Sequence, residues 1–350
     1  MSPFPLSLRL LVTALLVTTA CLPAQDEGEG PITAKPRTWT FVPFPESRCA
    51  NGSATGIGVN LNADSRDVLI YLQGGGACSS GEQCFGPVPG AANLTTGYGV
   101  EQFRGEANLS GIVFLDRFAQ DNPFREANLV FVPYCTGDLH AGDASATYDT
   151  PQGPRLAEHR GSHNLRQFLS RVTQTFPDAR RVWLVGASAG GFGALFNAHT
   201  VREAFAGVRV DVLSDSGPPF EVPAPLVQAW HERWRLQLPP DCVDCAERPE
   251  RILEHAVSAQ PDARVGLLAS QRDAVLALYA EVHADDLSRR MGELRGRIDS
   301  LPRGRVEAFV VSGGGHVVIA NRLARSDGVS LSQWLRQFAA DDPAWRSAWP

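Results

Sequence analysis

Residues 181–190 read Arg181-Val182-Trp183-Leu184-Val185-Gly186-Ala187-Ser188-Ala189-Gly190, an apolar run that leads directly into a Gly-x-Ser-x-Gly motif. The residues that follow, 191–196, are small and then apolar, as expected of a helix. A strand, a tight turn and a helix together present a nucleophilic serine, because glycines relieve crowding in the turn and a helix N-terminus favours developing negative charge. The stretch therefore predicts an α/β fold with Ser188 as a nucleophile. A glycine- and serine-rich loop that matches by chance is the alternative.

Short apolar runs rich in β-branched residues recur along the chain, and helical spacing appears between several of them. The runs are Val68–Leu72, Leu129–Pro133, Arg181–Val185, Val208–Leu213, Arg264–Leu268 and Val306–Val311, with helical spacing at 165–176, 275–282 and 331–338. Buried strands separated by helices predict a mostly parallel sheet with helices on both faces. Residues 218–261 interrupt this alternation with tryptophans, prolines and a Cys-x-x-Cys pair, so we interpret them as an inserted helical cap.

The beginning of the chain is typical of an export signal. Residues 1–20 carry one charge, at Arg9, then an apolar run too short to span a bilayer and a few small residues. Cleavage after Ala20 would leave Cys21 for lipid attachment, which would anchor the protein to a membrane, and cleavage after Ala24 is the alternative. Residues 21–36 are acidic and rich in Gly and Pro, as in a flexible linker. We expect a protein in the periplasm, outside the cell or lipid-anchored at the envelope.

The net charge bears on the partners of the protein, and the cysteine count bears on its disulfides. The formal net charge of the 350 residues is −6, which argues against nucleic acid as a partner. Apart from Cys21, six cysteines remain, an even number that predicts up to three disulfides in an exported chain. They are Cys49, Cys78, Cys84, Cys135, Cys242 and Cys245. A disulfide is the favoured interpretation of the Cys242-x-x-Cys245 pair, and a redox or metal site is the alternative.

A serine nucleophile needs a general base, and His316 is the best candidate. It closes the run Ser312–His316, in which three glycines follow the last expected strand. His140 and His163 are the rivals, but both precede Ser188, whereas the acid and then the histidine follow the serine in α/β-hydrolases.

Two aspartates follow expected strands after Ser188 and are candidates for the acid that orients the base. Asp273 comes after the second of these strands and Asp215 after the first. The strand count favours Asp273, and Asp215 is then expected to line or support the pocket. A helix-capping role is the alternative for either carboxylate.

Hydrogen-bond donors for an oxyanion are expected from two places. One is the backbone N–H of Ala189, directly after the nucleophile, and the other is the loop Gln73–Cys78, which contains three consecutive glycines. Phosphate binding is the competing interpretation of such a loop, but no Lys-Ser/Thr pair follows it.

Several short motifs together resemble the pectin acetylesterase and Notum family of α/β-hydrolase-like serine carboxylesterases. They are Cys49-Ala50-Asn51-Gly52-Ser53, Gln73-Gly74-Gly75-Gly76-Ala77-Cys78 with Cys84 soon after, Val132-Pro133-Tyr134-Cys135-Thr136-Gly137-Asp138, Gly186-Ala187-Ser188-Ala189-Gly190-Gly191, Asp273 and Gly315-His316. The resemblance extends from about Thr38 to Ala320 and is that of an exported, bacterial-type member. It implies one catalytic domain over residues 37–350 that includes the cap.

The resemblance also implies roles for individual residues. The triad would be Ser188, Asp273 and His316, and the oxyanion donors would be the N–H groups of Gly75, Gly76 and Ala189. The disulfide pattern of the family implies Cys49–Cys135 and Cys78–Cys84, which leaves Cys242 and Cys245 as a local pair.

The chain departs from the family at two positions of the glycine loop. Gln73 stands where plant and animal members usually have Glu, and Gly76 stands where they have a bulky aromatic residue. We expect a hydrolase that removes an acetyl or other acyl group from a carbohydrate or another extracellular ester through an acyl-enzyme, without a metal or organic cofactor. A hydrolase of polyesters or amides, or a non-catalytic surface binding protein with this fold, is the alternative. The oligomeric state stays open.

Overall fold

The computed structural model describes residues 28–88, 90–106 and 112–350. The expected signal at 1–20 and the candidate lipidation site Cys21 lie outside these residues, as does the first part of the 21–36 linker. Among the described residues, no helix combines the length and the apolar character needed to cross a membrane.

The centre of the molecule is an eight-stranded sheet in the order β1-β2-β4-β3-β7-β8-β9-β10. The strands are β1 (Thr40–Phe44), β2 (Thr55–Asn60), β3 (Asp67–Leu72), β4 (Asn128–Val132), β7 (Arg181–Ala187), β8 (Arg209–Asp215), β9 (Val265–Ser270) and β10 (Val306–Val311). The six strands β4, β3, β7, β8, β9 and β10 are parallel, and β2 pairs antiparallel with both β1 and β4. The mostly parallel sheet predicted from the apolar runs is therefore confirmed, with an antiparallel edge that was not predicted.

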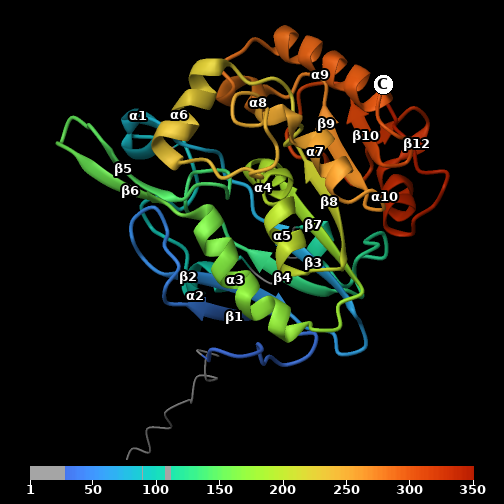
Figure 1. The fold of residues 1–350 in the computed structure, drawn as a ribbon, viewed down its shortest axis with the longest axis horizontal. Helices are drawn as coiled ribbons and strands as arrows, with labels where there is room; N and C mark the ends of the chain where they lie inside the picture. The colour runs from blue at the N-terminus through green and yellow to red at the C-terminus, as the bar shows by residue number, and fades with distance from the viewer. Residues whose placement is uncertain (1–27, 89, 107–111) are drawn as a thin grey trace, which may run out of the picture.

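Helices cover both faces of this sheet, because successive side chains of a strand point to opposite sides. Val182 and Leu184 in β7 join one core cluster, whereas Trp183 and Val185 join the other. The first cluster also holds α3 (Gly161–Thr175), α4 (Ala189–Phe196), α5 (Ala198–Ala204), α7 (Ile252–Ala259) and α9 (Ala284–Asp299), and the second holds α2 (Val100–Gly105), η2 (Val113–Leu115) and α10 (Leu331–Ala339). In Figure 1, α3 and α5 lie in front of the strands. The fold is therefore α/β-hydrolase-like.

The region interpreted as a cap contains α6 (Ala224–Trp234), η3 (Pro249–Arg251) and α7. Trp230 and Trp234 of α6 stack with ring centroids 5.3 Å apart, and both are buried. The indole N–H of Trp234 donates to the main-chain oxygen of Cys78 at 2.8 Å. This helix is thereby tied to the loop that follows β3.

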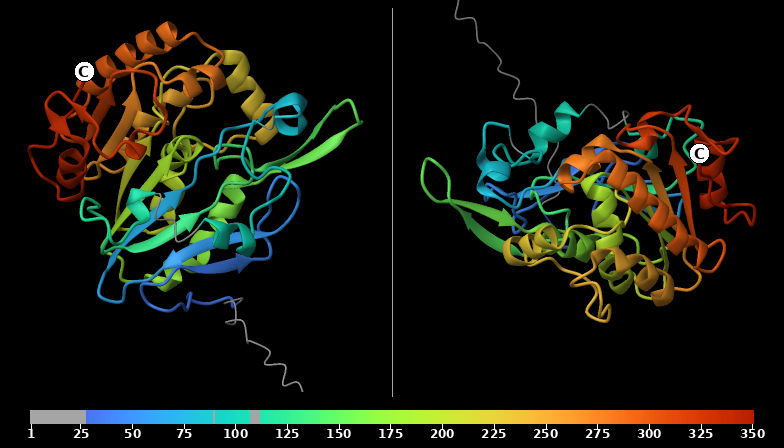
Figure 2. Two further views of the ribbon diagram at one scale, coloured as in Figure 1. Left: turned by 180° about the vertical axis from the view of Figure 1, so that it is seen from behind. Right: turned by 90° about the horizontal axis from the view of Figure 1, so that it is seen from above.

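Some elements differ from expectation. The helix expected over 275–282 is shorter, since α8 (Ala274–Tyr279) ends before Val282 and leaves Leu278 74% exposed. A second helix, α9, follows it. A hairpin of β5 (Ala144–Tyr148) and β6 (Arg155–His159) extends away from the body and was not predicted (Figures 1 and 2). A small ribbon pairs β11 (Arg325–Ser326) with β12 (Val329–Ser330), and η4 (Val318–Ala320) precedes it.

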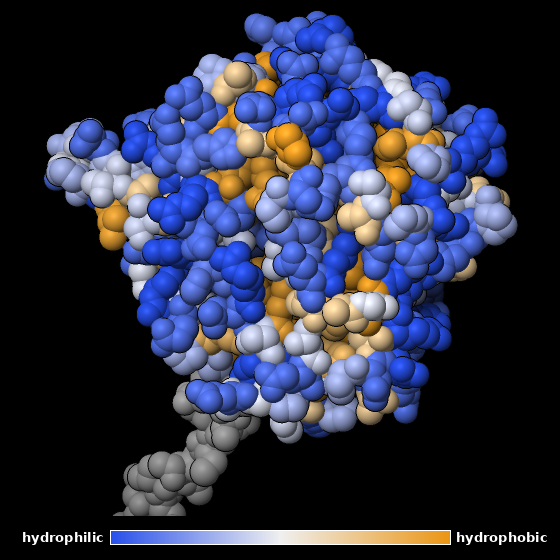
Figure 3. All heavy atoms as spheres, viewed as in Figure 1, coloured by the Kyte–Doolittle hydropathy of each residue, from blue (hydrophilic) through white to orange (hydrophobic). Residues whose placement is uncertain are grey.

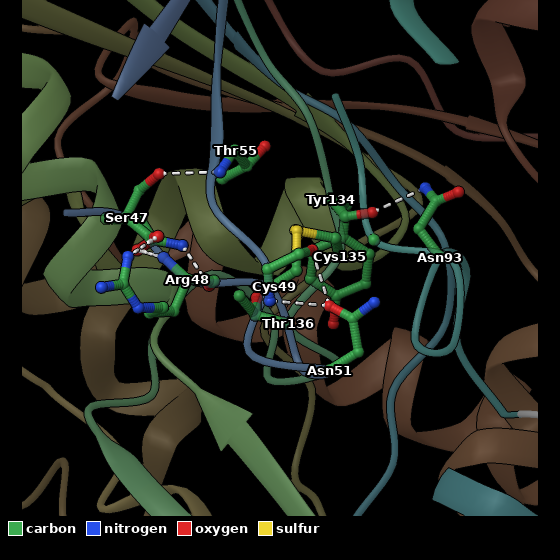
Figure 4. The surroundings of a disulfide bond; sticks show 12 residues. Ser47, Arg48, Cys49, Asn51, Thr55, Asn93, Tyr134, Cys135 and Thr136 are labelled. Atoms are coloured by element: carbon green, nitrogen blue, oxygen red, sulfur yellow. Dashed lines mark hydrogen bonds between the residues drawn. A yellow bond between two sulfur atoms is a disulfide. The ribbon is translucent and has the colours of Figure 1, made fainter. Parts of the chain in front are cut away.

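Three disulfides join the six cysteines in the pairs implied by the family resemblance: Cys49–Cys135, Cys78–Cys84 and Cys242–Cys245. The first connects the segment between β1 and β2 to the end of β4, 86 residues away, and closing so long a loop stabilises the fold by about 4–5 kcal/mol in the chain-entropy model. Figure 4 shows the first disulfide, and next to it Ala50 N–H donates to the Cys135 oxygen at 2.8 Å. The second disulfide lies between β3 and the end of α1 (Gly81–Phe85).

Candidate active site

Ser188 lies in a tight turn between β7 and α4. Its backbone has φ 55° and ψ −122°, a region that side-chain-bearing residues rarely adopt. The turn also requires two of its glycines, because a Cβ on Gly186 would overlap the main-chain oxygen of Gly190, and a Cβ on Gly190 would overlap that of Leu72. This strained geometry is typical of nucleophile turns and lifts the hydroxyl clear of the sheet.

His316 and Asp273 reach the serine from the ends of two neighbouring strands. His316 Nε2 lies 2.8 Å from Ser188 Oγ, and His316 Nδ1 lies 2.8 Å from Asp273 Oδ2 and 3.0 Å from Oδ1. The carboxylate can only accept, so Nδ1 carries the proton and Nε2 is free to accept from the serine hydroxyl. The structure thus brings these three predicted residues into one hydrogen-bonded line.

Asp273 is fully buried and has a second role. Its Oδ1 accepts from the N–H groups of Val275 and Leu276, each at 3.0 Å, and so caps the first turn of α8. The capping role considered as an alternative is therefore present together with the contact to His316, and the start of α8 fixes the carboxylate.

Asp215, the other candidate acid, lies at the end of β8 and does not bond the His316 ring. Its carboxylate accepts from the N–H groups of Val318 and Ile319, both at 2.9 Å. Burial raises the pKa of Asp215 to about 6, and these amide donors oppose that effect. The carboxylate supports the segment that follows His316.

The other histidines considered lie elsewhere. His140 is buried and its Nε2 donates to the main-chain oxygen of Gln73 at 2.8 Å, and burial lowers its pKa. His163 lies in α3. His159, which the sequence did not single out, donates from Nδ1 to the Thr136 oxygen and accepts at Nε2 from Tyr148, each at 2.8 Å.

The glycine loop lies directly over the serine turn. A Cβ on Gly74 would come within 2.5 Å of the Ala187 oxygen, and Gly75 and Gly76 adopt φ values of 152° and 77°. Within the described part of the chain, the N–H groups of Gly75, Gly76 and Ala189 donate to no other residue. These predicted oxyanion donors are therefore free.

The start of this loop is held by Gln73, the position where the chain departs from the family. Its backbone N–H donates to Val132 at 3.0 Å, its Oε1 accepts from Tyr134 N–H at 3.0 Å, and its Nε2 donates to Glu106 Oε1 at 2.7 Å. The Gln73 amide therefore satisfies one donor and one acceptor together, which a carboxylate at this position would not do.

A small apolar cavity of about 50 Å³ opens beside Ser188. Its walls come from the glycine loop and from α4, α6 and α8; the apolar lining includes Phe192, Phe220, Leu226, Trp230, Leu276 and Tyr279. Apolar residues reach the surface in the upper part of Figure 3, where α8 lies in Figure 1. The cavity joins Ser188, Ala189 and Gly76 to an apolar wall.

One group of side chains has the composition of a metal site, namely Cys78, Cys84 and His159. The two sulfurs are joined in a disulfide, and both ring nitrogens of His159 are already hydrogen-bonded. This donor set does not fit a metal ion, because a thiolate is the ligand form of cysteine.

Comparison with known proteins relates this chain to a family of esterases. A family model described as Pectinacetylesterase matches residues 36–232. The chain is 30% identical over 176 residues to a palmitoleoyl-protein carboxylesterase, notum1, of Xenopus laevis, covering 48% of this chain and 34% of that protein. It is 29% identical over 175 residues to the NOTUM carboxylesterase of Homo sapiens, with the same two coverages, and 26% identical over 215 residues to that of Drosophila melanogaster, covering 55% and 31%. The chain thus spans about a third of the length of the curated relatives it matches.

Proposed function

The chain belongs to the pectinacetylesterase family, and from this membership we propose that it is a carboxylic ester hydrolase with Ser188 as its nucleophile. The observation that carries the proposal is the line from Ser188 Oγ through His316 to Asp273, with both contacts at 2.8 Å. A serine is activated when its hydroxyl lies within hydrogen-bond distance of a base and an acid orients that base.

The proposed reaction proceeds in two halves. His316 takes the Ser188 proton as the oxygen attacks the ester carbonyl, and the resulting imidazolium is stabilised by Asp273. His316 then gives the proton to the leaving alcohol, which leaves an acyl group on Ser188. Water, deprotonated by the same histidine, attacks this acyl-enzyme and releases the acid.

The charge that develops on the carbonyl oxygen would be held by the free N–H groups of Gly75, Gly76 and Ala189. Each such donor contributes roughly 3–4 kcal/mol to lowering the barrier in measured cases. Ala189 is also the first residue of α4, whose N-terminus favours negative charge at the same place.

The apolar cavity supports a short acyl group. Its volume of about 50 Å³ is about a third of the roughly 150 Å³ apolar cavity that admits a benzene ring, which favours a short chain. Acetyl to butyryl chains fit this space. The palmitoleoyl chain in the relatives' names is much larger than this cavity. We therefore propose a short-chain acyl ester, such as an acetylated polysaccharide, as the substrate.

An exported location agrees with three disulfides, which persist in oxidising compartments. We propose that residues 1–20 are the export signal and that Cys21 is the attachment point of a lipid. The mass of the mature N-terminus, measured on protein from an exporting host, tests both parts.

The activity is tested by Ser188→Ala and by a panel of substrates. The panel comprises acetylated pectin, acetylxylan, short- and long-chain p-nitrophenyl esters, a polyester and a peptide amide. We expect turnover of the acetyl esters by the wild type, labelling of Ser188 by a fluorophosphonate, and neither in Ser188→Ala with an unchanged fold. Full turnover in Ser188→Ala would overturn the assignment, and an unreactive, folded wild type would favour a binding protein.

A further inference from the structure

Asp215 holds the serine turn through its main chain. Its carbonyl oxygen accepts from the N–H of Ser188 at 2.7 Å. The residue is fully buried at the end of β8, which pairs in register with β7 up to Asp215 and Ala187. The position of Ser188 is therefore tied to that of Asp215.

Asp215 and its neighbour Ser216 also hold the segment after His316, through their side chains. Three consecutive amides are bound: Val317 N–H donates to Ser216 Oγ, and Val318 and Ile319 donate to the two carboxylate oxygens of Asp215, all at 2.9 Å. Ser216 Oγ in turn donates to Asp215 Oδ1 at 3.1 Å. Asp215 and Ser216 thus contact the backbone on both sides of the Ser188–His316 hydrogen bond.

The backbone on the histidine side is strained. Val317 has φ 63° and ψ 91°, and Ser216 has φ 52°. Residues with side chains rarely adopt positive φ, and a β-branched valine is an outlier there. Such conformations persist only where the surroundings hold them, which in this case are the hydrogen bonds to Ser216 and Asp215.

The glycines before His316 are held by a different partner. The oxygens of Gly313 and Gly314 accept from the N–H groups of Arg272 and Ala274, which flank Asp273. A Cβ on Gly313 or Gly315 would meet no atom within 4 Å, whereas a Cβ on Gly314 would lie 2.9 Å from the Arg272 oxygen. The segment before His316 is thus attached to the acid, and the segment after it is attached to Asp215 and, through Asp215, to the nucleophile.

We propose that Asp215, with Ser216, is a positioning residue that sets the distance between the Ser188 hydroxyl and the His316 ring. The proposal rests on the ester hydrolysis proposed above, because it concerns how the nucleophile and the base of that reaction are aligned. Asp215 touches no reacting atom, so it acts only through Ser188 and His316.

Asp215 is a charged clamp at neutral pH. Burial raises its pKa to about 6, and the amide donors and a positive His316 oppose that rise, so the carboxylate is ionised above pH 6. An ionised Asp215 can accept at both oxygens, whereas an uncharged amide of the same shape accepts at one only.

The test is the variant Asp215→Asn, assayed with p-nitrophenyl acetate. We expect kcat to fall by about 10- to 100-fold, since a misplacement of about 1 Å costs on the order of 100-fold, while KM stays within twofold. The rate of fluorophosphonate labelling at Ser188 should fall in parallel. A loss of folded protein alone would lower the active fraction without changing KM or the labelling rate of the folded remainder.

A matched pair of variants keeps the test decisive if Asp215→Asn does not fold. Ser216→Ala removes the acceptor for Val317, and we expect a roughly tenfold lower kcat. Ser214→Ala, two residues earlier, removes a buried hydroxyl that donates to the Gly217 oxygen instead, and we expect wild-type kcat. Equal losses in both variants, or wild-type kcat in folded Asp215→Asn, would overturn the proposal.

Failure of the proposed function would look different. A wild type that neither hydrolyses esters nor takes the fluorophosphonate would overturn the ester hydrolysis and the positioning role together. A reactive wild type whose Asp215→Asn variant reacts equally fast overturns only the positioning role.

Discussion

Asp273→Asn separates the two roles of this carboxylate, because asparagine can replace it in one role but not in the other. In the helix cap, an amide oxygen still accepts from Val275 and Leu276, and asparagine is about as good an N-cap as aspartate. In the contact with His316, the amide nitrogen would take the place of Oδ2, 2.8 Å from Nδ1. Two hydrogen-bond donors would then face each other. The ring then places its proton on Nε2 and can no longer accept from Ser188.

The expected loss in kcat is about 10⁴-fold, the size measured when such an acid is amidated in serine proteases, or about 5.5 kcal/mol in the barrier. Unfolding in urea should change by no more than about 1 kcal/mol, as for a cap-to-cap exchange. The assay is p-nitrophenyl acetate hydrolysis at pH 7.5, with folded protein quantified by circular dichroism.

A control variant addresses the cap alone. Ser330→Ala removes the side chain that caps α10 by accepting from Gln333 N–H, and Ser330 makes no hydrogen bond to Ser188, Asp273 or His316. It should cost a similar ~1 kcal/mol of stability and leave kcat unchanged. The reasoning is refuted if folded Asp273→Asn keeps more than a tenth of the wild-type kcat, or if its activity falls only in proportion to unfolding.

Three further outcomes are expected. Gly76→Ala should lower kcat on p-nitrophenyl acetate by about 100-fold, because its Cβ would overlap the Gly90 oxygen at a positive φ and displace an oxyanion donor; near-normal kcat would contradict that role. Leu226→Ala should enlarge the acyl cavity and raise the hexanoyl-to-acetyl ratio of kcat/KM about tenfold, because about two more methylene groups would be buried. An unchanged ratio would show that Leu226 does not limit the length of the acyl chain. Asp215 has a folded pKa of about 6, above its ordinary 3.8, so its stabilising contribution is complete below 3.8 and is lost as pH rises through 6. Wild type should therefore lose about 2 kcal/mol relative to Asp215→Asn between pH 4.5 and 7.5 in urea unfolding, and a constant difference would contradict the raised pKa.

The parallel core of the sheet was predictable because its strands are buried on both faces and therefore appear as continuous apolar runs. Strand β2 does not have this pattern, since it contains Gly56 and Gly58. Gly58 makes room for Phe103, a contact that sequence alone does not reveal.

Helix α9 was missed although its signal is present in the sequence. Leu287, Met291, Leu294 and Ile298 recur at helical spacing and form its buried side. The charged residues between them conceal this pattern when only apolar runs are sought.

For the site, the sequence predicted the local motifs more readily than the roles of residues that are distant along the chain. The motif around Ser188 and the glycine run before His316 are local features, so the sequence identified both as candidates. Asp215 and Asp273 each follow a parallel strand and therefore end at the same edge of the sheet. The strand count favoured Asp273, and the hydrogen bonds show the difference directly, since Asp273 contacts the ring of His316 and Asp215 contacts the amides that follow it.

The strand order has a consequence for a chain that is still being made. Ser188 follows β7 in the middle of the sheet, but His316 lies 128 residues later in the chain, just after the edge strand β10. A nascent chain that has not yet reached residue 316 therefore carries Ser188 without the histidine that accepts its proton in the proposed reaction. Under that proposal, Ser188 gains its general base only near the end of synthesis.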